Sequence, residues 1–162
     1  VAKNVFDQHM KTTNQIESVR GEIGARVTES DLLQLPTIPR DTAITSKGLT
    51  HGIGIVLAYT EAWLRGIGCI PLHNAMEDAA TAEISRAQIW QWRHLGACTA
   101  DDGQLISSGR IAAIIQQTIA GKGGKFQLAG KLVEEMLTAE QLDDFLTSVC
   151  YPHIVTNTHS KL

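Results

Sequence analysis

The sequence predicts an all-α protein, a bundle of roughly five helices that carries an irregular N-terminal extension. Apolar residues recur at the 3.6-residue spacing of helices in several separate segments, and capping residues or glycines bound these segments. No segment has a strand pattern of more than marginal strength. A length of 162 residues favours one domain, because a chain of about 150 residues can bury roughly 68–70% of its unfolded surface.

The composition excludes several classes of protein. Hydrophobic residues make up 43% of the chain and charged residues 19%, which is typical of a folded globular protein. The formal charge of −3 indicates no basic surface for nucleic acid. No apolar run approaches the roughly 18 residues of a membrane-spanning helix, and no secretory signal follows Val1. We therefore expect neither nucleic acid nor a membrane as a partner, and a start at Val rather than Met indicates a processed or excised piece.

The cysteines and histidines do not form a metal motif. Cys69, Cys98 and Cys150 are widely spaced and include no C-x-x-C pair, so we expect free, mostly buried thiols in a reducing compartment. The six histidines show neither H-x-x-x-H nor H-E-x-x-H spacing. The sequence therefore predicts no metal ligands.

Residues 1–44 are mixed in character and are predicted to be a linker or extension rather than a domain. A short helix is expected around residues 29–35, where Pro36 and Pro39 break the pattern. A helical domain over residues 45–155 follows, and its first long helix runs from Ser46 to Leu64. The apolar stripe of that helix is wide, so we expect it to be central.

A second long helix is predicted to begin at Asp78 and to end at His94 or Leu95. A capping box from Asn74 is an alternative start, but Asp78 is followed by an uninterrupted helical first turn. Glu77 and Asp78 form a pair of carboxylates where a glycine-rich loop meets this helix. A directed carboxylate of that kind can act as a general base. On spacing alone, an ordinary N-cap beside an exposed Glu77 is the favoured interpretation.

Three further helices are expected in the remainder of the domain. Ser107 caps the first, and residues 128–136 mark the second. Thr138 is predicted to cap the last helix, which Pro152 ends. The apolar residues of that last helix that we expect to face inward are Leu142, Phe145, Leu146 and Val149.

The start of the second helix closely resembles the signature of the malate synthase family. The segment reads Met76-Glu77-Asp78-Ala79-Ala80-Thr81-Ala82-Glu83-Ile84-Ser85-Arg86 and continues to Ile89-Trp90-Gln91-Trp92. Two upstream patterns are also similar to that family, namely Tyr59-x-x-x-Trp63-x-x-Gly66-x-Gly68-Cys69 and Phe6-Asp7-x-His9-Met10-x-Thr12-x-Asn14-Gln15. The two tryptophans lie on different faces of one helix, so we expect one in the core and one at an interface.

The resemblance implies a position within a larger enzyme. Malate synthases have a TIM barrel that binds Mg²⁺ and glyoxylate, followed by a C-terminal helical plug over the barrel mouth. This chain resembles the plug and the linker that leads into it, and the barrel has no counterpart in it. The chain alone is therefore expected to bind no cofactor and to be inactive.

By the same resemblance, Asp78 is the catalytic base. It would take a proton from the methyl group of acetyl-CoA, and the resulting enolate would attack glyoxylate to give malate and CoA. Met76 and Cys69 are expected near the arm of the substrate that carries the thioester. A correctly aimed base and preorganised positive charge are both needed for this chemistry, and the chain supplies only the base.

The chain ends in Ser160-Lys161-Leu162, which matches a peroxisomal address that an import receptor reads. Coincidence is the alternative for so short a pattern. Together with the family resemblance, it predicts residence in the peroxisome or glyoxysome matrix, with residues 156–162 as a flexible tail. It also indicates that any missing part lies N-terminal to Val1.

Two other functions remain open from the sequence. The chain could be a non-catalytic helical interaction or cargo module, or part of a related acyl-CoA condensing enzyme with another acceptor. The acceptor pocket would lie in the barrel, so these residues cannot distinguish acceptors.

Overall fold

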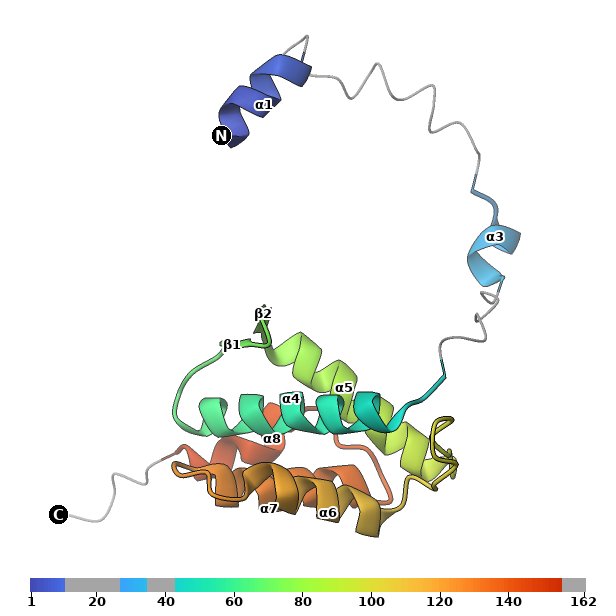
Figure 1. The fold of residues 1–162 in the computed structure, drawn as a ribbon, viewed down its shortest axis with the longest axis vertical. Coiled ribbons are helices and arrows are strands. Elements are labelled where there is room, and N and C mark those ends of the chain that lie inside the picture. The colour runs from blue at the N-terminus through green and yellow to red at the C-terminus, as the bar shows by residue number, and fades with distance from the viewer. Residues whose placement is uncertain (11–26, 35–42, 156–162) are drawn as a thin grey trace, which may run out of the picture. The chain divides into compact units, whose positions relative to one another are not determined.

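The computed structural model describes residues 1–10, 27–34 and 43–155. The chain divides into two compact units, Val1–Pro39 and Arg40–Leu162. In the first unit the described helices are α1 (Ala2–His9) and α3 (Glu29–Leu33) (Figure 1). The short helix expected around residues 29–35 is thus confirmed. Thr28 begins it through a capping box, in which its side chain accepts from the backbone N–H of Asp31.

The second unit is helical, as the sequence predicts. Its elements in chain order are α4 (Ser46–Leu64), β1 (Ile70–Leu72), β2 (Ala75–Glu77), α5 (Ala79–His94), α6 (Ser108–Ile119), α7 (Phe126–Thr138), α8 (Leu146–Cys150) and a 3₁₀ turn (Tyr151–His153). The all-α class is therefore confirmed for the described part of the chain. None of its helices is both long enough and apolar enough to cross a membrane.

Helix α4 is the central element, which confirms the expectation from its wide apolar stripe. It packs against α5, α6, α7 and α8, and Figure 1 shows it running through the middle of this unit. Leu49, Ile53 and Leu57 on α4 are completely buried. Thr45 caps its start and Gly66, at φ +88°, follows its end. The buried core that forms around α4 includes Ile89, Ile111, Ile115, Val133, Met136 and Leu137.

A β-hairpin precedes α5, where the sequence predicts only a loop. Strands β1 and β2 pair antiparallel, with Ile70 opposite Glu77 and Leu72 opposite Ala75. The two loop residues, His73 and Asn74, both have positive φ, as a tight two-residue hairpin turn requires. Each strand has three residues and β1 contains a proline, so the strand pattern is too short to detect from sequence.

The C-terminal part of the unit differs from the prediction. Thr138 is the last residue of α7 and not the cap of a following helix. The final helix, α8, begins only at Leu146, and Phe145 is 60% exposed rather than facing inward. The reason is tertiary: side chains of α5 bind the backbone at Asp143 and Leu146 and so hold this segment outside a helix.

The cysteines are free, as expected, but their predicted burial is wrong for two of the three. Cys69 and Cys98 are exposed, and only Cys150 is buried. Burial raises the pKa of the Cys150 thiol to about 11. This thiol is therefore a packed apolar group rather than a nucleophile.

Candidate functional site

Asp78 is the N-cap of α5, as predicted. Its Oδ1 accepts hydrogen bonds from the backbone N–H groups of Ala80 at 2.9 Å and Thr81 at 3.2 Å. The Thr81 hydroxyl in turn accepts from the Asp78 N–H at 3.0 Å, which completes a capping box. Within the described residues, Oδ2 of Asp78 has no hydrogen-bond partner, and the residue is exposed. The carboxylate is thus held through one oxygen and open to a reactant through the other.

Glu77 is buried, although the sequence predicts an exposed residue beside the N-cap. It is 9% exposed, whereas Asp78 is open to solvent. Glu77 is the last residue of β2, and Asp78 continues in extended conformation with φ −124° and ψ −169°. Because successive residues of extended backbone point to opposite faces, the two carboxylates separate. Only the carboxylate of Asp78 is accessible.

The hairpin brings the other two predicted site residues to the same element. Met76 lies on β2, opposite Pro71, and is 65% exposed. Cys69 is exposed and directly precedes β1. Ile70 pairs with Glu77 at the open end of the hairpin, and Cys69 and Asp78 are the residues that directly flank this pair in the sequence. All three predicted residues therefore lie on, or next to, one hairpin.

Tyr59 is a neighbour of this group to which sequence reasoning gave no role. It lies on α4 and is 2% exposed. Burial raises the pKa of Tyr59, and negative charge on Asp78, Glu83 and Cys69 raises it further. Tyr59 occupies a core-facing position of α4, which indicates ordinary packing in the sequence, so its electrostatic interaction with Asp78 is seen only in the structure.

One face of α5 is bound to an irregular stretch, residues 139–146, which ends at the first residue of α8 and which we call the anchor segment. Glu83 Oε1 accepts from the Leu146 N–H at 2.6 Å, and Arg86 Nη2 donates to the Asp143 carbonyl at 2.9 Å. Arg86 is 2% exposed and pairs with Glu83, with Nη2 to Oε2 at 2.7 Å. This pairing fixes α5, and therefore its N-cap, relative to the end of the domain.

Both tryptophans of α5 are half-buried. Trp90 donates its indole N–H to the Ala139 carbonyl at 2.8 Å, and Arg93 donates to the same oxygen at 2.6 Å. Trp92 packs against the core, which confirms the predicted core tryptophan. Trp90 stacks on His94 with ring centroids 4.7 Å apart. The expectation that Trp90 forms an interface stays a prediction.

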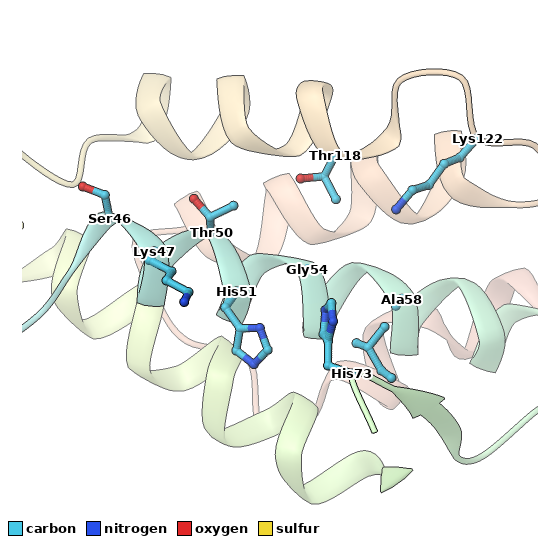
Figure 2. A pocket seen from close by; sticks show the side chains of 10 residues that line it. Ser46, Lys47, Thr50, His51, Gly54, Ala58, His73, Thr118 and Lys122 are labelled. Carbon is cyan, nitrogen blue, oxygen red and sulfur yellow. The ribbon is translucent and has the colours of Figure 1, made fainter. Parts of the chain in front are cut away.

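A groove of about 630 Å³ is lined by residues of α4, the hairpin and the end of α6 (Figure 2). It is bounded by α4, the loop of the hairpin and the C-terminal part of α6 with the turn that follows it. Four of its ten lining residues carry basic side chains, and none is acidic. The lining residues are Ser46, Lys47, Thr50, His51, Gly54, Ala58, Leu72, His73, Thr118 and Lys122. We call this feature the basic groove.

The predicted targeting residues, Ser160, Lys161 and Leu162, lie outside the described residues. In the described part of the chain, no three His, Cys, Asp or Glu side chains come together in a way that could hold a metal ion. The chemistry that these residues offer is therefore that of a directed, accessible carboxylate at the start of a well-anchored helix.

Comparison with known proteins identifies this domain type. Residues 43–154 match the family model described as malate synthase, C-terminal. The chain is 41% identical over 167 residues to a bifunctional glyoxylate cycle protein of Caenorhabditis elegans, covering 96% of the chain and 16% of that protein. It is 38% identical over 165 residues to the malate synthase of Myxococcus xanthus, covering 93% of the chain and 28% of that protein.

A third relative is named glyoxysomal. The chain is 38% identical over 162 residues to the glyoxysomal malate synthase of Candida tropicalis, covering 96% of the chain and 29% of that protein. In all three alignments the chain spans less than a third of the relative's length.

Proposed function

This chain belongs to the malate synthase family, and we propose that it supplies the catalytic base of the malate synthase reaction. The family predicted from the segment around Asp78 is thereby confirmed. The chain corresponds to the family's C-terminal domain. Its function within the complete protein is what we propose.

The single observation that carries the proposal is the asymmetric environment of the Asp78 carboxylate. Oδ1 is held by two backbone N–H groups, at 2.9 and 3.2 Å, so the direction of the carboxylate is fixed. Oδ2 is left without a hydrogen-bond partner among the described residues and faces outward. A general base needs both features, a fixed aim and a free lone pair within reach of the proton.

The proposed reaction starts with transfer of a methyl proton of acetyl-CoA to Oδ2 of Asp78. The resulting enolate carbon forms a bond to the aldehyde carbon of glyoxylate. The aldehyde oxygen takes up one proton from solvent to become a hydroxyl group, and Asp78 returns its proton to solvent. Water then hydrolyses the thioester, which releases the CoA thiol and leaves malate. We propose that Met76, on the hairpin, and Cys69, which like Asp78 directly flanks it, lie along the thioester arm of the substrate.

The partner in this proposal is the TIM barrel of the complete protein. We assign to the barrel the Mg²⁺, the glyoxylate pocket and the positive charge that stabilises the enolate, since the family resemblance implies them there. We propose that residues 1–44 link to the barrel and that residues 45–155 form the plug. A base without these groups does not complete the reaction, so the chain alone is proposed to be inactive.

We propose the peroxisome or glyoxysome matrix as the location, with Ser160-Lys161-Leu162 as the address. The glyoxysomal name of the relative from Candida tropicalis supports this proposal. The import receptor that reads such addresses is the corresponding proposed partner.

The test is the turnover of the complete protein with Asp78→Asn. Asparagine caps helices about as well as aspartate, so the fold is retained, but its amide cannot accept the methyl proton. We expect kcat to fall on the order of 10²–10⁴-fold. The matched control is Glu77→Gln, which neutralises the buried carboxylate one residue earlier and should leave kcat within about 10-fold of the wild type. An Asp78→Asn protein that melts normally and turns over normally would refute the proposal.

A further inference from the structure

We propose that Glu83 and Arg86 are positioning residues for the proposed base, because they set where α5, and with it Asp78, lies in the domain. This inference rests on the proposed function, since it concerns the same carboxylate. Neither residue touches the substrate in this proposal. Both lie in the first half of α5, and both bind the anchor segment.

The apolar face of α5 is small. Of its sixteen residues, all of them described by the structure, three are buried, namely Ala82, Arg86 and Ile89. These three share one face of the helix, because they are spaced by four and three positions. On α4, against which α5 packs, ten residues are buried. Arg86 therefore occupies the central position of a face that otherwise holds one alanine and one isoleucine.

The surface of α4 that faces α5 offers little to hold the helix in register. Gly52 of α4 lies against Ile89, since a Cβ added at Gly52 would come 3.1 Å from Ile89 Cδ1 and 3.9 Å from Ser85 Cβ. Glycine has no side chain that could interlock with a neighbouring helix, and apolar contact is itself non-directional. A small rotation or slide of α5 along this contact therefore meets little resistance unless directional bonds oppose it.

The directional bonds come from Glu83 and Arg86. Glu83 Oε1 accepts from the Leu146 N–H at 2.6 Å, and Glu83 Oε2 accepts from Arg86 Nε at 2.8 Å and from Nη2 at 2.7 Å. Arg86 Nη2 also donates to the Asp143 carbonyl at 2.9 Å. Two side chains of one helix thus bind two separate backbone groups of the anchor segment. Attachment at two points opposes rotation of the helix as well as sliding along its axis.

The buried ion pair is a poor source of stability, which favours a geometric role. Arg86 is 2% exposed, and its Nη1 has no hydrogen-bond partner among the described residues. Taking two charges out of water costs free energy that a buried pair often fails to recover, and apolar residues of similar volume stabilise a fold equally well. Apolar residues cannot supply the direction of a forked, charge-assisted hydrogen bond.

This direction passes along the helix to the proposed base. Oδ1 of Asp78 is held by the backbone N–H groups of Ala80 and Thr81, in the first turn of the same helix. The carboxylate therefore moves with α5. A misplacement of about 1 Å can lower a reaction rate on the order of 10²-fold. We expect loss of the Glu83 and Arg86 contacts to slow proton removal although Asp78 itself is unchanged.

The experiment uses two variants of the complete protein that keep both charges, Arg86→Lys and Glu83→Asp. Lysine lacks the fork that reaches Glu83 and the Asp143 carbonyl together, and aspartate is one methylene shorter than the side chain that binds Leu146 and Arg86. Exchange of the acetyl-CoA methyl protons with deuterated solvent and steady-state turnover are measured where circular dichroism shows each protein to be folded. We expect exchange and kcat to fall at least about 10-fold, with KM for acetyl-CoA within about threefold of the wild type.

Two controls separate positioning from a loss of stability. Ile111→Ala removes a completely buried side chain from α6, so it lowers the melting temperature while the contacts of Glu83 and Arg86 stay in place. Gln88→Ala changes an exposed side chain of α5 itself. Both variants, when folded, should exchange the methyl protons within about twofold of the wild-type rate, because neither moves the start of α5.

Normal exchange by both Arg86→Lys and Glu83→Asp overturns the proposal, and if one of them does not fold, the other decides. An equal loss of exchange in Ile111→Ala also overturns it, because stability would then be the cause. Asp78→Asn separates this failure from failure of the proposed base. Normal exchange by Asp78→Asn refutes the base, whereas slow exchange by Asp78→Asn beside normal exchange by the two charge-preserving variants refutes only the positioning role.

Discussion

The two oxygens of Asp78 are used differently. Oδ1 accepts from two backbone N–H groups at the start of α5, while Oδ2 is open. One side chain thus contributes to helix stability and, in the proposed reaction, to proton transfer. Because the cap fixes the direction of the carboxylate, whatever fixes α5 also fixes the position of the proposed base.

Arg86 binds α5 to the anchor segment from a buried position. It is 2% exposed, pairs with Glu83 and donates to the Asp143 carbonyl. Its Nη1 is buried without a hydrogen-bond partner among the described residues. A buried charge is tolerated only while it is paired, so the Glu83–Arg86 contact must persist in the folded state.

We predict that Arg86→Met lowers the free energy of unfolding by about 3 kcal/mol, because it leaves Glu83 without its partner. Urea unfolding of the chain, followed by circular dichroism, measures the change. Lys131→Met is the control: it removes an exposed pair with Glu135 at 4.0 Å, and should cost less than about 0.5 kcal/mol. Equal stability of Arg86→Met and the wild type would contradict the anchoring role.

At the scale of elements, the turn between α6 and α7 is fastened to the end of α4 through Glu61. The carboxylate of Glu61 accepts from Arg65 at 2.8 and 2.9 Å and from the backbone N–H of Lys125 at 3.2 Å. Burial pushes its pKa upward, but these hydrogen bonds outweigh burial and hold the pKa of Glu61 below its ordinary value. The turn passes close to this carboxylate at Gly124, whose φ is +64°.

We predict that Gly124→Ala destabilises the domain by more than about 1 kcal/mol. An added Cβ would lie 2.8 Å from Glu61 Oε1, and positive φ is strained for alanine. Gly123→Ala is the matched control, because a Cβ there meets no atom within 4 Å and should change stability by less than about 0.5 kcal/mol. Thermal unfolding of both variants provides the comparison, and equal melting temperatures would refute the steric argument.

A second set of hydrogen bonds, centred on Asp102, joins the start of α4 to the turn before α6. The Thr99 hydroxyl, the backbone N–H of Gln104 and the Ser46 hydroxyl all donate to Asp102, and with Arg110 they hold the pKa of Asp102 well below its usual range. A carboxyl whose pKa is lowered by folding stabilises the protein above its unfolded pKa, and this contribution is lost as pH falls toward the folded value.

We therefore predict that the stability difference between the wild type and Asp102→Asn is constant from pH 7 to about 5 and shrinks below about pH 4, near the ordinary pKa of aspartate. Urea midpoints at pH 7, 5, 4 and 3 measure it. A difference that stays the same down to pH 3 would show that the ionised Asp102 carboxylate adds nothing to the fold.

The long helices could be predicted from sequence because their ends depend on local signals. Asp78 and Gly96, at the two ends of α5, act within one helical turn. The hairpin could not be predicted, because strands of three residues are too short to show an alternation of apolar and polar residues. The anchor segment was missed for another reason: its backbone partners come from α5, more than 45 residues away in sequence. Local propensity contains no information about such contacts.

The site was predicted unevenly for similar reasons. Asp78 was found through its cap position and the family segment around it. The burial of Glu77 follows from the β2 pairing, which the sequence did not reveal. Tyr59 has the spacing of an ordinary core residue of α4, so the sequence does not distinguish it from its neighbours. The basic groove combines side chains from three elements, so no local sequence pattern indicates it.

At the scale of the whole molecule, the described C-terminal unit matches the C-terminal domain of malate synthases and presents a directed carboxylate on its surface. A base on one domain and the groups that stabilise the enolate on another would make catalysis depend on how the two domains meet. Replacing Asp78 should then slow proton removal more than neutralising any neighbouring residue on the hairpin does.

The most direct test of the central claim is the exchange of the acetyl-CoA methyl protons with deuterated solvent, catalysed by the complete protein and followed by NMR. This exchange reports removal of the proton before any carbon–carbon bond forms. We predict that Asp78→Asn slows the exchange on the order of 10²–10⁴-fold, while Glu77→Gln leaves it near the wild-type rate. Normal exchange by Asp78→Asn together with its loss in Glu77→Gln would contradict the account and assign the base to the other carboxylate.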